Sequence, residues 1–367
     1  MNMPPGAILV REVATRLLST LADVSWVKVT RVEVVGGDDL AVTAQSADGC
    51  RVEFLVHVKS ELRPVAFSTW ATARRHTDAV HVLALPVVSP RLAELCRHHG
   101  WSWLDLVGNC WLDVPGVLRI ERTGAAPAHK LPRRGHGLKT PAAARVLRVL
   151  LSPAHAGRAW TQRTIQAATC DHLPGAKQVS LGLVNKVVQH LRDQAFVEDG
   201  EAGLRLRDPV GLLSAWRDQY RLDPRQRLSF FTLSKPKVLS EAIDGLTSEF
   251  GTVCVYAAYS AAERQAPQVR QPRTWVYVRA DHLDDFVRAT GATPVDSGEN
   301  LVVLLPGDPG VFQNFGALRS GGHTDHACTD PVQTHVDLTE LGGRGLEAAQ
   351  AILEQRLLPA WQKVGLA

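Results

Sequence analysis

Apolar residues recur along the first third of the chain at spacings that alternate between helix and strand. Val10, Val13, Leu17 and Leu21 follow a helical period and predict an amphipathic opening helix. Further along, short apolar runs predict strands with helices between them. The expected strands are 26–35, 40–45, 52–59, 81–88, 103–107 and 117–122, and the expected helices are 67–76 and 89–99. This alternation predicts an α/β domain over residues 1–124.

The central segment, residues 138–222, combines helical periodicity with a short hairpin. Residues that favour the start of a helix precede three of its apolar stretches, namely Thr140-Pro141, Thr161 and Ser180. The third predicted helix carries one apolar stripe, formed by Val184, Val187, Val188 and Leu191. Strand-like residues 196–198 and 204–206 then flank a turn at 199–203. Three helices followed by a hairpin is the element order of a winged helix-turn-helix.

The last segment, residues 227–367, returns to alternating strands and helices. Its expected strands are 253–256, 274–278 and 301–305, and its expected helices are 240–250, 282–289 and 346–358. Residues 125–137 are rich in Ala, Pro, Gly and basic residues and predict a linker. The sequence therefore predicts an α/β multidomain protein with domains at 1–124, 138–222 and 227–367.

Positive charge is concentrated in one part of the chain. Between Lys130 and Arg192 there are eleven Lys or Arg residues and one acidic residue, Asp171, which gives 11 − 1 = +10. The whole chain is only +4, so the remainder sums to 4 − 10 = −6. A basic block that coincides with a helix-turn-helix predicts a DNA-binding surface. The alternative is a winged helix that mediates protein contacts and has a solvated basic face.

In a helix-turn-helix, the second helix of the motif enters the major groove of DNA. In this chain that helix is the third predicted helix, which spans residues 180–194. The expected DNA contacts are Lys177, Ser180, Asn185, Lys186, Gln189, His190, Arg205 and Arg207. Asn and Gln suit bidentate contacts to adenine, and Lys suits guanine or phosphate. Lys177 and Ser180 stand at the predicted helix start, which favours a phosphate. Arg205 and Arg207 in the hairpin are expected to contact a neighbouring phosphate or the minor groove.

The first segment carries what remains of a nuclease-like motif. Asp39 on one predicted strand and Val56-His57-Val58-Lys59 on the next resemble the restriction-endonuclease-like PD-(D/E)xK arrangement. That chemistry needs two carboxylates to hold Mg²⁺ and a Lys to assist the attacking water. His57 stands where the second carboxylate is expected, and imidazole is a poor ligand for Mg²⁺. The sequence predicts a degenerate core without catalytic residues. The alternative is a Mg²⁺-dependent nuclease that uses Asp39, Lys59 and a displaced carboxylate.

Further signatures follow the nuclease-like strand. They are Leu62-Arg63-Pro64, Trp103-Leu104-Asp105-Leu106-Val107-Gly108-Asn109, Asp330-Pro331-Val332-Gln333, Val336-Asp337-Leu338 and Gly342-Gly343-Arg344-Gly345-Leu346-Glu347-Ala348-Ala349. In this order, with the winged helix between them, they resemble the AbiEi-like antitoxins and transcriptional regulators of type IV toxin–antitoxin systems. The resemblance implies a regulator that represses its own operon and is paired with a nucleotidyltransferase-like toxin. The family also contains solitary regulators, and both alternatives stay open.

The expected partners are double-stranded operator DNA, a second copy of the chain and, through the resemblance, such a toxin. A homodimer is expected because operators are usually two-fold symmetric. No cofactor is predicted, and the cluster of His323, Asp325, His326 and Cys328 is interpreted as a solvated polar loop rather than a metal site. No membrane span or secretion signal is visible, and the six cysteines form no CxxC pair. These features favour a cytoplasmic, non-enzymatic regulator.

Two further motifs are expected to be structural. Asp105 and Asn109 flank Gly108 on a strand-to-turn segment, where short polar side chains bond to local backbone groups. Residues 342–345 superficially resemble a phosphate loop but lack its GK[ST] ending. The apolar stripe that follows them predicts a role in packing.

Overall fold

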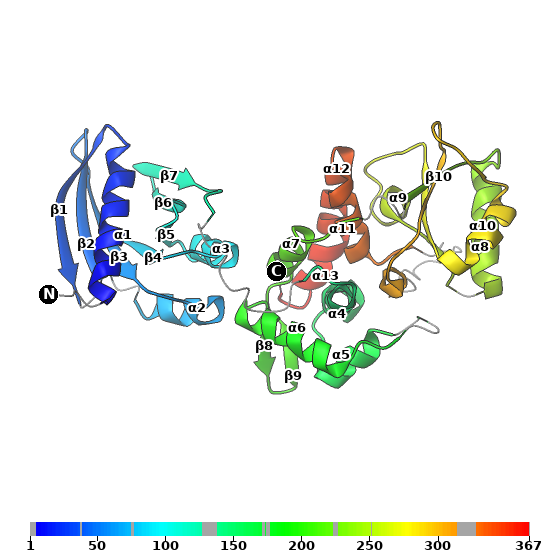
Figure 1. The fold of residues 1–367 in the computed structure, drawn as a ribbon, viewed down its shortest axis with the longest axis horizontal. Helices are drawn as coiled ribbons and strands as arrows, with labels where there is room; N and C mark the ends of the chain where they lie inside the picture. Colours follow the sequence, from blue (N-terminus) through cyan, green and yellow to red (C-terminus); the bar gives the residue numbers. More distant parts are fainter. Residues whose placement is uncertain are drawn as a thin grey trace. The chain divides into compact units, whose positions relative to one another are not determined.

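A computed structural model describes residues 5–36, 39–74, 77–126, 138–170, 173, 177–222, 227–250, 252–313 and 328–366. The chain divides into two compact units, Met1–Arg134 and Gly135–Ala367. Each unit combines helices with a β-sheet (Figure 1). The predicted α/β class is therefore confirmed for both.

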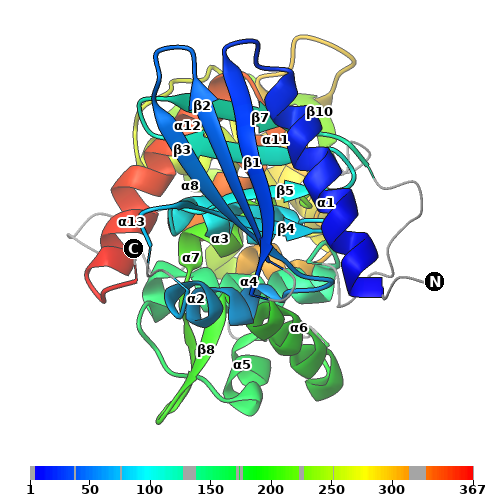
Figure 2. The same cartoon turned by 90° about the vertical axis from the view of Figure 1, so that its left-hand side faces the viewer.

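The first unit is a seven-stranded sheet in which each strand lies beside the next one in the chain (Figures 1 and 2). The strands are β1 (Val27–Val35), β2 (Asp39–Ser46), β3 (Arg51–Val58), β4 (Val80–Leu85), β5 (Ser102–Asp105), β6 (Cys110–Val114) and β7 (Leu118–Arg122). The pairs β3–β4 and β4–β5 are parallel, and the other neighbouring pairs are antiparallel. Helices α2 (Pro64–Thr72) and α3 (Pro90–His98) make the two parallel connections, and α1 (Pro5–Ala22) precedes the sheet.

These helices cover opposite faces of the sheet. Val82 and Ala84 of β4 belong to a core that also contains the buried residues of α1. Leu83 and Leu85, between and after them, belong to the core of α2 and α3. Because successive strand residues point to opposite faces, α1 lies on one face, and α2 and α3 lie on the other.

The second unit begins with the helices that the sequence predicts. Its first elements are α4 (Pro141–Leu151), α5 (Gln162–Ala168), α6 (Leu181–Asp193), β8 (Val197–Gly200), β9 (Gly203–Leu206) and α7 (Pro209–Arg217). Thr140, Thr161 and Ser180 each cap a helix by accepting a hydrogen bond from a backbone N–H of the first turn. All three predicted helix starts are confirmed.

A five-stranded sheet follows, with the strand order β11-β12-β14-β10-β13. Its strands are β10 (Arg227–Phe231), β11 (Cys254–Tyr256), β12 (Thr274–Val278), β13 (Thr293–Pro294) and β14 (Leu301–Leu304). The helices of this part are α8 (Pro236–Phe250), α9 (Ala258–Gln265), α10 (Leu283–Thr290), α11 (Pro331–Leu341), α12 (Arg344–Ile352) and α13 (Leu358–Gln362). Leu301 and Val303 share a core with α8 and α10, whereas Val302 and Leu304 belong to the core of α9, α11 and α12. Helices therefore cover both faces of this sheet.

The central segment and the C-terminal residues share one core. Leu147 of α4 and Val188 of α6 belong to the same buried cluster as Val336 of α11 and Trp361 of α13. The indole Nε1 of Trp361 also donates a hydrogen bond to the carbonyl oxygen of Leu151 at 3.2 Å. The structure thus joins in one unit two segments that the sequence predicts as separate domains. Residues 127–137 of the predicted linker lie outside the described residues.

The glycine-rich residues 342–345 serve packing, as predicted. Gly342 and Gly343 have positive φ angles of 64° and 52° in the turn between α11 and α12. At Gly345, a Cβ atom would overlap the carbonyl oxygen of Leu338. The motif therefore allows α12 to approach α11 closely.

The hairpin of β8 and β9 is extended by one residue from outside it. The backbone N–H groups of Trp160 and Leu204 each donate to the other residue's carbonyl oxygen at 2.8 Å. Gly203, beside this pair, has a φ of +123°, and a Cβ atom there would lie 2.6 Å from the carbonyl oxygen of Trp160. Only glycine fits this close approach without strain.

We expect Gly203→Ala to lower the free energy of unfolding by about 1–3 kcal/mol, because strained backbone at positive φ typically costs that much. Gly182→Ala is the matched control, since Gly182 lies in α6 with open space around its Cα and alanine favours a helix. Urea denaturation of the two variants measures the difference. Equal stabilities would show that the hairpin does not need this glycine.

Candidate nucleic-acid interface

Helix α6 has one buried face and one polar face. The predicted apolar stripe is fully buried and consists of Val184, Val187, Val188 and Leu191. Asn185, Lys186 and Gln189 are exposed on the other side, and His190 is half-buried at its flank. The helix therefore presents a row of long polar side chains to solvent.

The segment that leads into α6 is held by hydrogen bonds from neighbouring helices. Arg145 of α4 donates from Nη1 to the carbonyl oxygen of Lys177 at 2.7 Å. Gln166 of α5 donates from Nε2 to the carbonyl oxygen of Val179 at 2.9 Å. The side chains of Lys177 and Ser180 are both exposed, and the Ser180 hydroxyl accepts from the N–H of Leu183 at 3.3 Å. The position of the α6 N-terminus is thus fixed by its surroundings.

Arg205 and Arg207 lie on and just beyond β9, and both are exposed. The hairpin is fixed to α6 by an ion pair between Arg192 and Asp199, with 2.6 Å between Nη2 and Oδ1. The hairpin also has exposed acidic residues, namely Glu198, Asp199 and Glu201. Its charge is therefore mixed, with the basic side chains on the second strand.

Of the eight basic residues of the charged window that the structure describes, two are buried. Arg145 forms a bidentate ion pair with Asp308, with Nε–Oδ1 and Nη2–Oδ2 distances of 2.9 and 2.8 Å. Arg148 donates from Nε to Oε1 of Gln333 at 2.7 Å. The prediction that the whole window contributes to a polyanion-binding surface is wrong for these two arginines, because α4 is enclosed by the C-terminal segment. Lys130, Arg133 and Arg134 lie outside the described residues.

Exposed basic residues remain before α4 and around α5, α6 and β9. They are Lys139, Arg158, Arg163, Lys177, Lys186, Arg205 and Arg207. Within the described part of the chain, none of these side chains forms an ion pair with a carboxylate. The guanidinium of Arg158 instead lies over the ring of Trp160, 4.2 Å from its centroid. These uncompensated charges are available to an anionic ligand.

The Asp-Pro-Val-Gln and Val-Asp-Leu motifs form a buried polar network against α4. Oδ1 of Asp337 accepts hydrogen bonds from the hydroxyls of Tyr220 and Tyr277 at 2.5 and 3.1 Å, and from Gln333 Nε2 at 2.7 Å. Oδ2 of Asp330 accepts from the Ser152 hydroxyl at 2.7 Å. These bonds connect α11 to α4, to β12 and to the segment after α7. The motifs therefore have a structural role in the second unit.

Burial changes the ionisation of both carboxyls. It raises the pKa of Asp330 and of Asp337 to about 6, although hydrogen bonds and the nearby Arg148 partly oppose the shift. The folded state therefore binds protons more tightly than the unfolded state, where the pKa is near 3.8. The stabilisation from the protonated carboxyls is complete below about pH 4 and is lost as the pH rises through about 6.

We expect Asp337→Asn to become more stable relative to the parent as the pH rises from 4 to 7, because the variant has no carboxylate to desolvate. A difference of roughly two pKa units corresponds to about 3 kcal/mol per group. Urea denaturation at a series of pH values measures the change. Asp284→Asn, at an exposed carboxyl, is the control and should track the parent. A parent–variant difference that is constant from pH 4 to 7 would contradict the burial argument.

In the first unit, Asp39 and His57 meet on the face that α2 and α3 cover. His57 Nδ1 donates to Oδ2 of Asp39 at 2.7 Å, and His57 Nε2 is 3.2 Å from Nδ1 of His81. Nε2 of His81 is 3.4 Å from the hydroxyl of Thr77. All three contacts are satisfied when both imidazoles are neutral: the Thr77 hydroxyl donates to His81, His81 donates to His57, and His57 donates to Asp39. Both ring nitrogens of His57 are thus already engaged.

The surroundings of His57 favour its neutral form. Burial lowers its pKa below the usual value, against the raising effect of Asp39, and His81 and Arg74 lower it further. Lys59 follows two residues later and is half-buried. Among the described residues, no group of three or more His, Cys, Asp or Glu side chains is placed to hold a metal ion. The cluster at 323–328 lies outside the described residues except for Cys328, which is buried.

Asp105 and Asn109 fix a turn, as predicted. Oδ1 of Asp105 accepts from the N–H groups of Gly108 and Asn109 at 2.9 and 2.8 Å. The Asn109 amide then pairs with the backbone of Ala125 in both directions, at 3.0 and 2.9 Å. This motif therefore anchors the end of the first unit.

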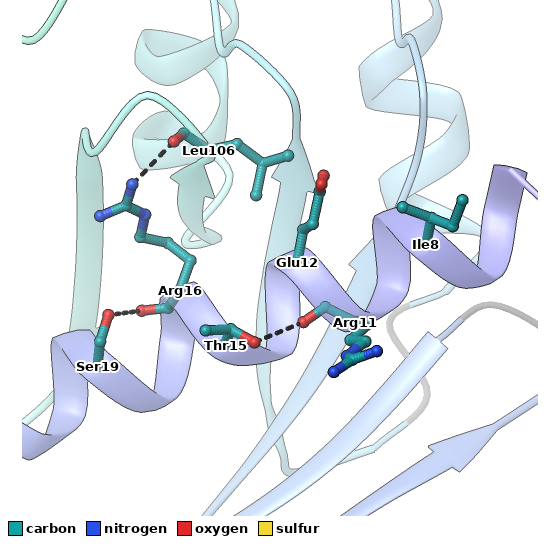
Figure 3. Close-up of a pocket in the computed structure, with 7 residues that line it drawn as sticks. All are labelled: Ile8, Arg11, Glu12, Thr15, Arg16, Ser19 and Leu106. Carbon is teal, nitrogen blue, oxygen red and sulfur yellow. Dashed lines mark hydrogen bonds between the residues drawn. The ribbon is translucent and has the colours of Figure 1, made fainter.

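A pocket in the first unit lies between one side of α1 and the loop after β5. It is lined by Ile8, Arg11, Glu12, Thr15, Arg16, Ser19 and Leu106 (Figure 3). Arg16 crosses towards the loop and donates from Nη2 to the carbonyl oxygen of Leu106 at 3.0 Å (Figure 3). Glu12 is the single carboxylate among the residues that line the pocket. The lining therefore offers no pair of carboxyl groups for acid–base catalysis.

The sequence did not predict one polar contact at the surface of α6. Gln162, the first residue of α5, donates from Nε2 to Oδ1 of Asn185 at 2.9 Å. The residues are 23 positions apart, and no periodicity connects them. Only the packing of α5 against α6 brings them together.

No protein-family model, curated protein or solved structure matches this chain. Within the described residues, no helix is both long enough and apolar enough to cross a membrane.

Proposed function

We propose that this protein is a sequence-specific DNA-binding transcriptional regulator whose reading element is α6. The observation that carries the proposal is the exposed polar face of α6, with Asn185, Lys186 and Gln189 opposite a fully buried apolar stripe. Amide side chains are suited to adenine, and lysine is suited to guanine or phosphate. The uncompensated basic residues around this helix supply the electrostatic attraction to the DNA backbone.

The elements around α6 support a winged helix-turn-helix. Helices α4, α5 and α6 are followed by the β8–β9 hairpin, and Trp160 adds a short backbone pairing beside β9. In this arrangement α6 would enter the major groove, while Arg205 and Arg207 would contact the flanking backbone or minor groove. Lys177 and Ser180, at the start of α6, would face a phosphate.

For the first unit, we propose a degenerate restriction-endonuclease-like core that holds rather than cuts DNA or serves as scaffold. His57 occupies the position of the second carboxylate, and its hydrogen bonds to Asp39 and His81 leave neither ring nitrogen free. We expect duplex DNA incubated with the protein and Mg²⁺ to stay intact on a gel. Cleavage that Lys59→Ala abolishes would overturn the regulator-only proposal.

The DNA-binding proposal is tested with the DNA that precedes the protein's own gene. Fluorescence anisotropy should show tighter binding to that fragment than to a shuffled fragment of equal length, by a factor of roughly 10³ or more. A variant with Asn185→Ala should lose part of this preference. Equal affinity for both fragments would reject recognition of a sequence in front of the protein's own gene.

The resemblance to AbiEi-like proteins extends the proposal to repression of the protein's own operon. Expression from a promoter–reporter fusion should be low with the parent protein and higher with the Asn185→Ala variant. A separate experiment tests whether the partner is a nucleotidyltransferase-like toxin. The neighbouring gene is expressed with and without this chain, and cell growth is measured. A harmless neighbour would leave a solitary regulator.

A further inference from the structure

At one edge of the first sheet, the outer side of strand β1 has no partner strand among the described residues. β1 is the terminal strand of the sheet, and among the described residues only β2 pairs with it. Val32 and Val34 are 39% and 62% exposed, although Val42 and Leu40, opposite them on β2, are buried. A strand edge with exposed apolar side chains is a template for pairing with another strand.

The charges on β1 are complementary to themselves. Arg31 and Glu33 stand on either side of Val32, and both are exposed. In the single chain they form an ion pair with each other, with 2.6 Å between Nη2 and Oε1, and this exposed pair can exchange for the same contact across two strands. When two copies of β1 lie antiparallel with Val32 opposite Val32, each Arg31 stands opposite Glu33 of the other copy. In the neighbouring registers, the two-fold axis passes through residue 31 or residue 33 instead of Val32. The first register places Arg31 opposite Arg31, and the second places Glu33 opposite Glu33. Because opposite charges across strands are favourable and like charges are not, Arg31 and Glu33 favour the register about Val32 over these two neighbouring registers.

We infer that β1 is a homodimerisation edge, at which two copies of the chain pair antiparallel about Val32 and form one continuous sheet. The occupant is a second copy because the charge pattern matches itself, and a two-fold axis at Val32 closes the assembly. A bulge between Val29 and Arg31 limits the regular part of the strand. The interface is therefore small, and the dimer should be weak.

The purpose of this dimer rests on the proposed function, because two linked reading elements would bind paired half-sites with higher avidity. The existence of the dimer is independent of whether the protein binds DNA. The oligomeric state is measured without DNA, so that a failure of the dimer and a failure of DNA binding are separate results.

Sedimentation equilibrium of the full chain, from micromolar to near-millimolar concentration, tests the inference with two charge reversals. The parent should dimerise with increasing concentration. Arg31→Glu and Glu33→Arg should each remain monomeric, because each variant places like charges opposite each other. An equimolar mixture of the two variants should recover the dimer, since opposite charges then face each other at both cross-strand positions.

Three results would overturn the inference: a parent that stays monomeric throughout, single variants that dimerise as the parent does, or a mixture of folded variants that stays monomeric. Circular dichroism and thermal unfolding establish whether both variants are folded. We expect them to fold, because Arg31 and Glu33 are exposed. The double variant Arg31→Glu/Glu33→Arg restores the complementary pattern within one chain and should dimerise like the parent.

Discussion

Replacing Arg148 by alanine is expected to destabilise the second unit by about 3–5 kcal/mol, the range for removing one partner from a buried charged network. Arg148 donates to Gln333 at 2.7 Å and its guanidinium lies 5.6 Å from the ring centroid of Trp216. It is also a positive charge that acts on Asp330 and Asp337, whose pKa values it lowers. Without it, both carboxyls should titrate at higher pH.

Arg163→Ala is the matched control, since it removes the same side chain from an exposed position on α5. It should change the free energy of unfolding by less than about 0.5 kcal/mol. Guanidinium denaturation of the three proteins at pH 7 and pH 5 measures the effect, and the loss in Arg148→Ala should be smaller at pH 5, where the carboxyls are largely protonated. If Arg148→Ala unfolds like the parent, α4 is not held by this network.

The second large effect concerns DNA affinity. Neutralising Lys186, Arg205 and Arg207 together, each to alanine, should weaken binding to duplex DNA by roughly 1,000-fold or more at low salt, because under the proposed binding mode each substitution would remove a charge-assisted hydrogen bond. The slope of log affinity against log salt concentration should fall by about 0.9 for each phosphate that the variant no longer neutralises. Anisotropy titrations at several salt concentrations give both quantities.

A second triple variant controls for the removal of three positive charges as such. Lys235, Lys237 and Arg288 are exposed, and they lie at α8 and α10, on the face of the second sheet opposite to the helices that share a core with α6. Replacing them by alanine changes the net charge by the same amount, but should leave the affinity and the salt slope near those of the parent. If both triple variants lose affinity equally, the attraction comes from overall charge and not from a defined surface.

Local signals in the sequence were sufficient for much of the fold. The three helix starts in the second unit were predictable because a Ser or Thr cap acts on backbone groups within three residues. The strands β1–β4 were predictable for a similar reason, since an apolar run between turn residues has few alternatives. Their ends differ from the prediction by a few residues, as expected where fraying and packing decide the boundary.

Other features depend on contacts that no local pattern contains. Helix α11 was missed because Gln333, Thr334, His335 and Asp337 are polar yet buried, so that it shows no amphipathic period. Arg145 and Arg148 were predicted as surface charge because their partners lie 163 and 185 residues away. A buried polar residue is predictable only together with its partner.

The candidate sites show the same division. The sequence placed Asp39 and His57 on neighbouring strands, and their hydrogen bond follows from the sheet register. The contact between His57 and His81 needed the parallel pairing of β3 with β4. On α6, the exposed face followed from the apolar stripe alone, whereas the contact of Asn185 with Gln162 required the angle between two helices.

Selection of DNA from a random library by the full-length protein is the most direct test of whether α6 reads a DNA sequence. The parent is expected to enrich one short motif, and Asn185→Ala is expected to enrich the same motif with relaxed preference at one base pair, an effect of about 1–3 kcal/mol at that position. Enrichment of no motif, or of an unchanged motif by the variant, would contradict the assignment of α6 as the reading element.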